Sequence, residues 1–557
     1  MAELTLDSRP QLASHISFDA PTTAAGQWIV SAEEVPVSRV SRPVVELLRA
    51  LDGLTSLRDV RSVHGEHLSE VEFLALVGRF EARGLLAGAE RRPPGRVSFR
   101  PPLTLQVATL RAPTVFAGLD RVRRMVLRPW MLLLVAYAIT VGVLALLAQA
   151  PLAVSLLTEP LPLSSFLIVV GALILATLLH EAAHGMTLAS HGVLPRRAGV
   201  MLFYASPAFF VDVTNGWRLA DRRARVFVAL AGPAVHGTIG STAAIAALVT
   251  PDADVRDTLL ILALASWGIV AVNLVPFVRF DGYLALMSAL DIPNLRASAI
   301  GDVRDAAARL VLGAPPRPRR LRRPWTLLFG VLSVATPVVL IVWALDRILR
   351  AVAAGGAAGA VATLVVQALV AAALVVGVLR GTRRLLADGA KPVRIAVVGA
   401  SAVAIAAVLG LAIPVQTGVS IGFVADGSAV LLVTAGDEPA LVPGAPLTLS
   451  TQGVLGRREL ARSTVAAARD EPIELPLPAV YPIEARGVTL AGRAVGVAES
   501  AALAEVDLPS AGSAVVGTGE TTLWNALWRT NVVRPLGVLG IDLSGEPRGS
   551  AASAGEH

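Results

Sequence analysis

The sequence predicts a mainly α-helical protein that crosses a membrane about seven times, with a small soluble domain before the helices and a β-rich domain after them. Hydrophobic residues make up 54% of the 557 residues and the mean hydropathy is +0.64, values typical of a polytopic membrane protein. Long apolar runs bounded by arginines predict the spans. The absence of cysteine excludes a thiol nucleophile, a cysteine-ligated metal and disulfide bonds.

The basic charge is concentrated next to the apolar runs. The net charge of +7 comes almost entirely from arginine, and Lys391 is the only lysine. Arginines at helix ends indicate charge next to a lipid bilayer, so we expect no nucleic-acid partner. The composition, rich in Ala, Val and Arg, favours a bacterial source. We expect a multi-pass protein of the bacterial cytoplasmic membrane, and the polar N-terminus, which does not resemble a signal peptide, is expected to stay in the cytoplasm.

Residues 1–95 read as a separate soluble domain. Residues 27–30 and 35–40 predict strands, and 44–51, 57–63 and 69–85 predict helices, the last with a capping box of Ser69 and Glu72. This order of elements predicts a winged-helix-like fold and resembles the leader-peptide recognition domains of systems that modify ribosomally made peptides. The resemblance implies that an extended leader segment adds a strand to the sheet edge. A winged-helix domain with a regulatory or packing role is the alternative.

The membrane domain is predicted to cover residues 125–415 and to follow a linker at 96–124. Arg121, Arg123, Arg124 and Arg128 precede the first span and place the preceding domain in the cytoplasm. An odd number of crossings then places residues 416–557 outside the cell, where alternating apolar residues at 419–424, 429–433 and 441–449 predict strands. We expect disorder from residue 545. The predicted spans are 130–147, 163–186, 226–249, 259–277, 325–345, 358–379 and 395–415.

A short apolar segment at 201–213 contains Pro207 and cannot span a membrane. It is interpreted either as a re-entrant or strand-like segment beside the site described next, where an extended substrate could pair, or as a loop in the membrane interface.

The second span contains the motif His180-Glu181-Ala182-Ala183-His184. On a helix, His180 and His184 lie one turn apart on one face and can bind a divalent metal together. Glu181 can then take a proton from the metal's water. A chance occurrence, in which the histidines only hydrogen-bond, is the alternative, but ionisable groups at membrane depth are costly unless they are used.

A catalytic metal of this kind usually has a third protein ligand. Asp281 is the best candidate, because it is predicted to end the fourth span and Gly282 lets the chain bend there. Asn273 and Pro276 are expected to break that helix. The alternative is an interfacial Asp281 paired with Arg279.

The motif in one membrane helix, followed by Asn273-x-x-Pro276-x-x-x-x-Asp281-Gly282 at the end of another, resembles the site-2 protease family of intramembrane zinc metalloproteases. Over residues 163–283 the resemblance implies that His180, His184 and Asp281 bind Zn²⁺, that Glu181 activates water, and that Asn273 helps to hold the substrate. The chain is most similar to the branch linked to bacterial peptide maturation, including daptide-type biosynthesis. It departs from the family at His236, where Asn is usual after Ala-Gly-Pro.

Three functions compete at this point. The first is a zinc metalloendopeptidase that removes the leader from a ribosomally made modified peptide, with a substrate carrying a leader segment as its partner. The second is a site-2-type protease that cuts a membrane-bound signalling protein. The third is a non-enzymatic export or immunity protein with a structural metal.

Overall fold

The computed structural model describes residues 4–541 except 21–27, 33–34, 83, 89–95, 101–103, 110, 204–205, 354–355, 388, 427–428, 437–440, 500–502 and 504–505. The disorder predicted from residue 545 lies outside the described residues. The chain forms two compact units, which are considered separately. The first comprises residues 1–148, 170–251 and 262–293, and the second comprises 149–169, 252–261 and 294–557.

The N-terminal region of the first unit contains a three-stranded antiparallel sheet and three helices. The predicted strands and helices are confirmed, and one further strand precedes them. Ser69 and Glu72 form the predicted capping box, since each backbone N–H donates to the other side chain, at 3.1 and 3.3 Å. The core is aliphatic and aromatic, with Leu48, Phe73 and Val77 fully buried. The elements are β1 (Ile16–Asp19), β2 (Trp28–Ala32), β3 (Val35–Val40), α1 (Arg42–Arg49), α2 (Leu57–His64) and α3 (Glu70–Ala82).

The segment predicted as a linker, 96–124, instead contains two strands and most of two short helices. The second strand, β5, pairs with a strand about ninety residues later, β7, and Gly199 of β7 lies against the Val107 carbonyl, where a Cβ would collide. Proline and arginine near this segment suggested a linker, but its partner strand is too distant in sequence to be inferred locally. The elements are β4 (Val97–Arg100), β5 (Thr104–Thr109), α4 (Ala112–Gly118), α5 (Asp120–Val126), β7 (Ala198–Phe203) and β8 (Ser206–Val211), and the sheet order is β4-β5-β7-β8.

Within the described residues, seven helices are long and apolar enough to cross a membrane, as predicted, and they make the chain a candidate multi-pass membrane protein. They are α6 (Pro129–Ala148), α8 (Leu163–Ser190), α9 (Arg222–Val249), α10 (Ala253–Asn273), α13 (Thr326–Ala353), α14 (Gly356–Ala387) and α15 (Pro392–Ala412). The intervening short elements are α7 (Ala150–Leu156), β6 (Leu161–Pro162), η1 (Thr214–Arg218), α11 (Asp281–Leu290) and α12 (Leu295–Leu312).

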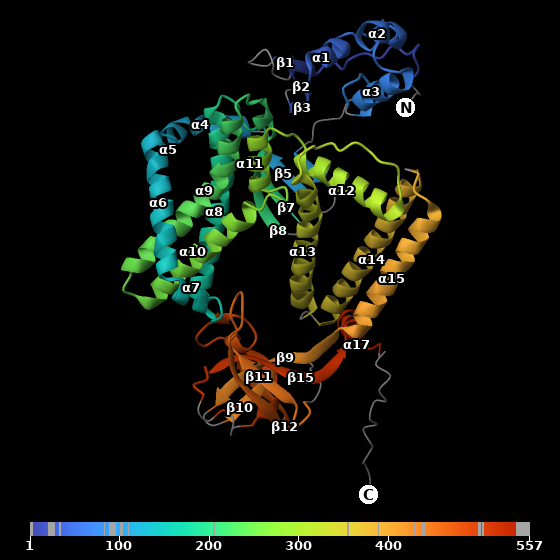
Figure 1. Ribbon diagram of the computed structural model, residues 1–557. Helices are drawn as coiled ribbons and strands as arrows, with labels where there is room; N and C mark the ends of the chain where they lie inside the picture. The colour runs from blue at the N-terminus through green and yellow to red at the C-terminus, as the bar shows by residue number, and fades with distance from the viewer. Residues whose placement is uncertain are drawn as a thin grey trace. The chain divides into compact units, whose positions relative to one another are not determined.

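Helices α6 and α9 of the first unit cross closely (Figure 1). Gly142 of α6 packs on the backbone of Ser241 in α9, whose hydroxyl donates to the Ile139 carbonyl at 3.3 Å. Small residues at such a crossing let two membrane helices approach each other.

The fourth span ends earlier than predicted. Helix α10 stops at Asn273, and Asp281 is the first residue of α11 instead of the last residue of the apolar helix. Pro276 lies in the break, where its missing N–H and fixed φ disfavour helix continuation.

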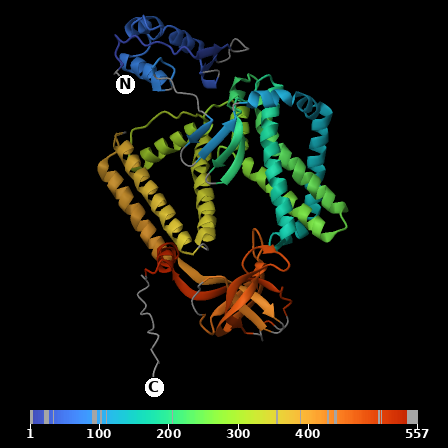
Figure 2. The same ribbon diagram turned by 180° about the vertical axis from the view of Figure 1, so that it is seen from behind.

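The C-terminal region of the second unit is a closed antiparallel barrel, which confirms the β-rich prediction (Figure 2). Phe423, Leu432 and Leu449 are fully buried in its core. Its strands, in the order β10-β14-β12-β11-β15-β9, are β9 (Pro414–Asp426), β10 (Ala429–Thr434), β11 (Pro446–Ser450), β12 (Glu459–Pro476), β14 (Thr489–Ala498) and β15 (Ala511–Thr522); η2 (Leu477–Ala479) and β13 (Ile483–Glu484) lie between β12 and β14.

A helical segment after the barrel was not predicted within the β-rich domain. It comprises α16 (Leu523–Trp528), η3 (Arg529–Val533) and α17 (Arg534–Val538). The Trp524 indole N–H donates to the Ala406 carbonyl of α15 at 3.0 Å, and Gly410 of α15 leaves room for the ring. The segment therefore packs back on the membrane helices.

The loop before α8 contacts the barrel. Glu159 pairs with Arg458 at 2.6 Å, and β6 forms a short parallel pair with β13. Both partners belong to the second unit, so the loop and the barrel are in contact within that unit.

Candidate metal centre

His180 and His184 lie in the last third of α8 and are both buried, at 6% and 5% exposure. Their four-residue spacing places both rings on one face of the helix. Their Nε2 atoms are 3.2 Å apart. Two imidazole nitrogens therefore converge on one point beside α8.

Asp281 completes the group because the chain turns sharply between α10 and α11. Gly282 packs so closely on the Leu274 carbonyl that a Cβ would collide with it. Tyr283, one residue further on, is buried. The Asp281 side chain consequently faces the two rings, with Oδ2 3.1 Å from His180 Nε2 and Oδ1 3.3 Å from His184 Nε2. The predicted tripod is thus brought together from elements almost a hundred residues apart.

These three separations suit a metal ion. Two ligand atoms bound tetrahedrally at zinc-like distances are roughly 3.3 Å apart, close to the three separations in the group. In the described part of the chain, buried Asp281 Oδ2 has no hydrogen bond of normal geometry and only its 3.1 Å approach to His180 Nε2, although a buried carboxylate oxygen needs a partner. Among the described residues, His180, His184 and Asp281 form a group that could hold a metal ion.

Helix α9 supports the group from the other side. The His184 Nδ1 lies 2.7 Å from the Val228 carbonyl, so Nδ1–H donates there and Nε2 keeps its lone pair for a ligand. Pro233 removes the helical N–H that would otherwise bond the Ala229 carbonyl, one residue after Val228. A Cβ at Gly232 would strike the Nε2 atoms of both histidines. Glycine at 232 therefore keeps the space between the rings open.

Glu181 follows the first histidine and is partly buried. Its Oε2 accepts a hydrogen bond from the backbone N–H of Val211, 2.8 Å away at the end of β8. One oxygen of the carboxylate is thereby fixed, while the carboxylate lies next to the histidine pair.

Strands β7 and β8 together contain nine of the thirteen residues in the apolar segment at 201–213, so the strand-like interpretation of that segment is confirmed. In the four-stranded sheet, β8 is an edge and pairs with β7 alone among the described strands. A sheet edge offers backbone donors and acceptors to an added strand. The edge ends at the residue that binds Glu181.

His236, one turn beyond Gly232 on α9, is 1% exposed. Its ring centroid lies 5.4 Å from that of His180, and its buried Nδ1 has no hydrogen-bond partner among the described residues. His236 belongs to the wall of the site but not to the metal-ligating group.

Asn273, predicted to hold substrate, is the last residue of α10. Its side-chain amide donates to the Ile269 carbonyl of the same helix at 3.0 Å. The structure thus gives it a helix-end hydrogen bond, and a contact with substrate stays a prediction.

Sequence reasoning missed two supports of the site, the Val211 N–H and the Val228 carbonyl. Both are backbone groups, so no residue type signals them. Ala-Gly-Pro at 231–233 was visible, but it suggested helix packing and not a cavity between imidazoles.

The fold and this group together define a multi-pass helical membrane protein with a buried site that could hold a metal. No protein-family model, curated protein or solved structure matches the chain.

Proposed function

We propose that the chain is an intramembrane zinc metalloprotease that removes the leader from a ribosomally made modified peptide. The observation that carries the proposal is the buried convergence of His180, His184 and Asp281 with Glu181 adjoining it. Two histidines and a carboxylate are a donor set typical of catalytic zinc. When bound there, zinc would supply a Lewis acid that makes water acidic and polarises a peptide carbonyl.

The protein's own groups supply the proton transfers. Glu181 takes a proton from the attacking water, whose oxygen adds to the carbonyl carbon of the peptide. The same carboxylic acid then gives the proton to the departing nitrogen as the C–N bond breaks. The products are a carboxylate and an amine, so the atoms balance with water as the only co-substrate.

The substrate is proposed to bind as a strand along β8. A helical substrate has its carbonyls already hydrogen-bonded, so the scissile segment must first unwind. The edge of β8 compensates for the lost helical bonds, and its end at Val211 lies next to Glu181. Backbone pairing also tolerates different side chains, as leader removal from related peptides requires.

The N-terminal region is proposed to be a winged-helix-like domain that recognises the leader. Its sheet order, β1-β2-β3, leaves β1 and β3 as edges, and an extended leader could add to either of them.

The decisive experiment uses the full chain in nanodiscs with a candidate precursor peptide. Wild type is expected to cut one peptide bond, seen by mass spectrometry. Glu181→Gln should retain one bound zinc but lower cleavage about 10²- to 10⁴-fold, and His184→Ala should lose the zinc. His191→Gln, a change one residue after the end of α8 and outside the group, is the matched control and should keep both. Equal cleavage by wild type and Glu181→Gln would contradict the protease.

A second measurement separates leader removal from cleavage of a membrane-bound signalling protein. Residues 1–88 are titrated with the leader and with a scrambled leader of equal composition. Selective binding supports the leader function. Cleavage that proceeds equally without the leader favours the signalling substrate.

A further inference from the structure

A strongly basic segment joins α12 to α13. Residues 317–323 contain five arginines, interrupted by one proline and one leucine. Helix α13, a candidate membrane span, begins at Thr326 three residues later. The segment therefore lies where a membrane-spanning helix enters the lipid headgroup region.

Part of this segment is fixed to α12 by one buried carboxylate. Asp302 is 3% exposed, and its side chain accepts hydrogen bonds from the backbone N–H groups of Arg320 and Leu321, at 2.8 and 3.0 Å. The Arg320 guanidinium also donates to Asp302 and to Asp305, at 3.2 and 2.9 Å. The segment is thus held in one conformation before any ligand arrives.

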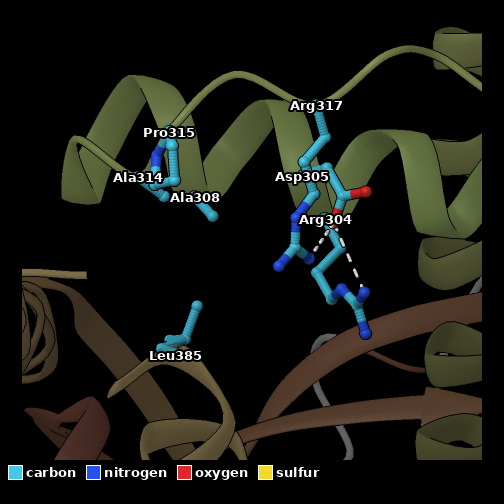
Figure 3. A pocket seen from close by; sticks show the side chains of 7 residues that line it. All are labelled: Arg304, Asp305, Ala308, Ala314, Pro315, Arg317 and Leu385. Atoms are coloured by element: carbon cyan, nitrogen blue, oxygen red, sulfur yellow. Dashed lines mark hydrogen bonds and ion pairs between the residues drawn. The ribbon is translucent and has the colours of Figure 1, made fainter. Parts of the chain in front are cut away.

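The acidic groups neutralise only some of the arginines. Arg304 and Arg317 both pair with Asp305, as Figure 3 shows. The cavity that these residues line with Leu385 has a volume of about 20 Å³, room for little more than a water molecule. A ligand of this region must therefore bind on the outer surface and not inside that cavity.

Three arginines remain on that surface. Arg319, Arg322 and Arg323 are exposed, and no acidic partner is found for them among the described residues. Exposed guanidinium groups without an acidic partner attract a phosphate group through their positive charge.

Apolar side chains are exposed on the same connection. Leu310 and Val311, in the last turn of α12, are 86% and 46% exposed, and Leu328 at the start of α13 is 63% exposed. Helix α12 lies against the first turns of α13, since Arg296 donates to the Ser333 carbonyl at 2.8 Å. Exposed aliphatic groups on the two helices that the basic segment joins fit a lipid, whereas a nucleic acid or free phosphate would leave them in water.

We propose that residues 309–328 form a binding site for the headgroup of an anionic phospholipid. Arg319, Arg322 and Arg323 bind the phosphate, and the aliphatic side chains of α12 and α13 contact the acyl chains. A basic residue near an anionic membrane surface strengthens binding about fivefold, so removing the three should weaken it about 100-fold.

The experiment uses the delipidated full chain in neutral detergent. Phosphatidylglycerol, phosphatidylcholine and inorganic phosphate are titrated separately, and bound lipid is counted by native mass spectrometry. Phosphatidylglycerol should bind at least about tenfold more tightly than phosphatidylcholine. The triple change Arg319→Gln, Arg322→Gln and Arg323→Gln should weaken phosphatidylglycerol binding about 100-fold without changing the Tm of the lipid-free protein.

Two controls make the result specific. Replacing Arg457, Arg469 and Arg486 of the barrel region with Gln removes the same charge and should leave lipid binding unchanged. Replacing Arg319, Arg322 and Arg323 with Lys keeps the charge and should keep most of the affinity, even if the Gln variant folds poorly. Equal binding of the two lipids, displacement of phosphatidylglycerol by inorganic phosphate at equal concentration, or equal losses in the barrel variant would overturn the proposal.

Discussion

The backbone N–H of Val211 donates a hydrogen bond to the Glu181 carboxylate across 2.8 Å. This bond joins the end of an edge strand to the residue next to the paired histidines. A peptide added along β8 would accordingly have a fixed register relative to the proposed general base.

Replacing Val211 with proline removes that N–H without touching the metal group. We expect cleavage to fall about 10- to 100-fold, the usual cost of losing an orienting partner, with zinc content unchanged. The measurement is kcat together with metal analysis. Val211→Ala keeps the N–H and should behave as wild type. Loss of zinc in the proline variant would show that the Val211–Glu181 hydrogen bond supports the metal group and does not only orient Glu181.

Gly232→Ala should abolish metal binding while preserving the fold. The added Cβ would collide with Nε2 of both His180 and His184, and zinc affinity is expected to drop about 100-fold or more. Alanine favours a helix more than glycine does, which offsets part of the strain of this collision, so the fold should be preserved. A Cβ at Gly237, on the same helix, would lie an ordinary 3.5 Å from Ile139. Gly237→Ala is therefore the control, and the zinc affinity of both variants is measured by isothermal titration.

His236→Leu should stabilise the protein and reduce its activity. Among the described residues, the buried Nδ1 of His236 has no hydrogen-bond partner, so an apolar replacement of similar volume should raise the free energy of unfolding by about 1 kcal/mol. Cleavage should fall because the site loses a polar wall beside His180. His236→Asn keeps a polar group and should show no gain in stability. A Tm of the leucine variant equal to or below that of wild type would refute the expectation.

The backbone amides at the start of α3 should become less protected against hydrogen exchange at acidic pH. Hydrogen bonds from the Ser69 hydroxyl and backbone N–H lower the pKa of Glu72 from its ordinary 4.5. Because the folded-state pKa is the lower one, this stabilisation is complete above 4.5 and is lost as pH falls through the lowered value. Hydrogen exchange of residues 70–75, corrected for intrinsic rates, should show the loss. Ser69→Ala should remove the pH dependence, and an unchanged dependence in that variant would argue against the capping box.

The predicted topology, with seven crossings, places the regions before and after the candidate spans on opposite sides of the membrane. The sequence has no cysteine, so single introduced cysteines can be labelled without background. Ser62→Cys should react with an impermeant maleimide only in inside-out vesicles, whereas Ser155→Cys and Arg486→Cys should both react in intact cells. Labelling of Ser62→Cys and Arg486→Cys from one side would require an even number of crossings.

The metal group could be predicted because metal binding requires particular residue types at a fixed spacing. His180 and His184 share a helical face by periodicity alone, and an isolated carboxylate after an apolar run limits the candidates for the third position. The seven spans were predictable for a similar reason, since bilayer thickness sets the length of each apolar run.

The parts that escaped prediction depend on partners distant in sequence or on backbone atoms. Strand β5 at 104–109 is paired with β7, and its own residues do not indicate which strand it pairs with. Asp281 begins a helix because Gly282 packs on the Leu274 carbonyl, a contact without a local signature. The helical segment at 523–538 was not predicted, because it packs through Trp524 on Gly410 of α15, a residue distant in sequence.

The first and last strands of the barrel, β9 and β15, pair along their length and both lead directly into helices, α15 and α16. A force on the barrel would therefore act in shear on the paired strands β9 and β15, from the pair Pro414–Thr522 to the pair Val424–Ala511. The hydrogen bonds between the two strands would resist this force together. The barrel is consequently joined to the helices through two hydrogen-bonded antiparallel strands instead of a single-stranded linker.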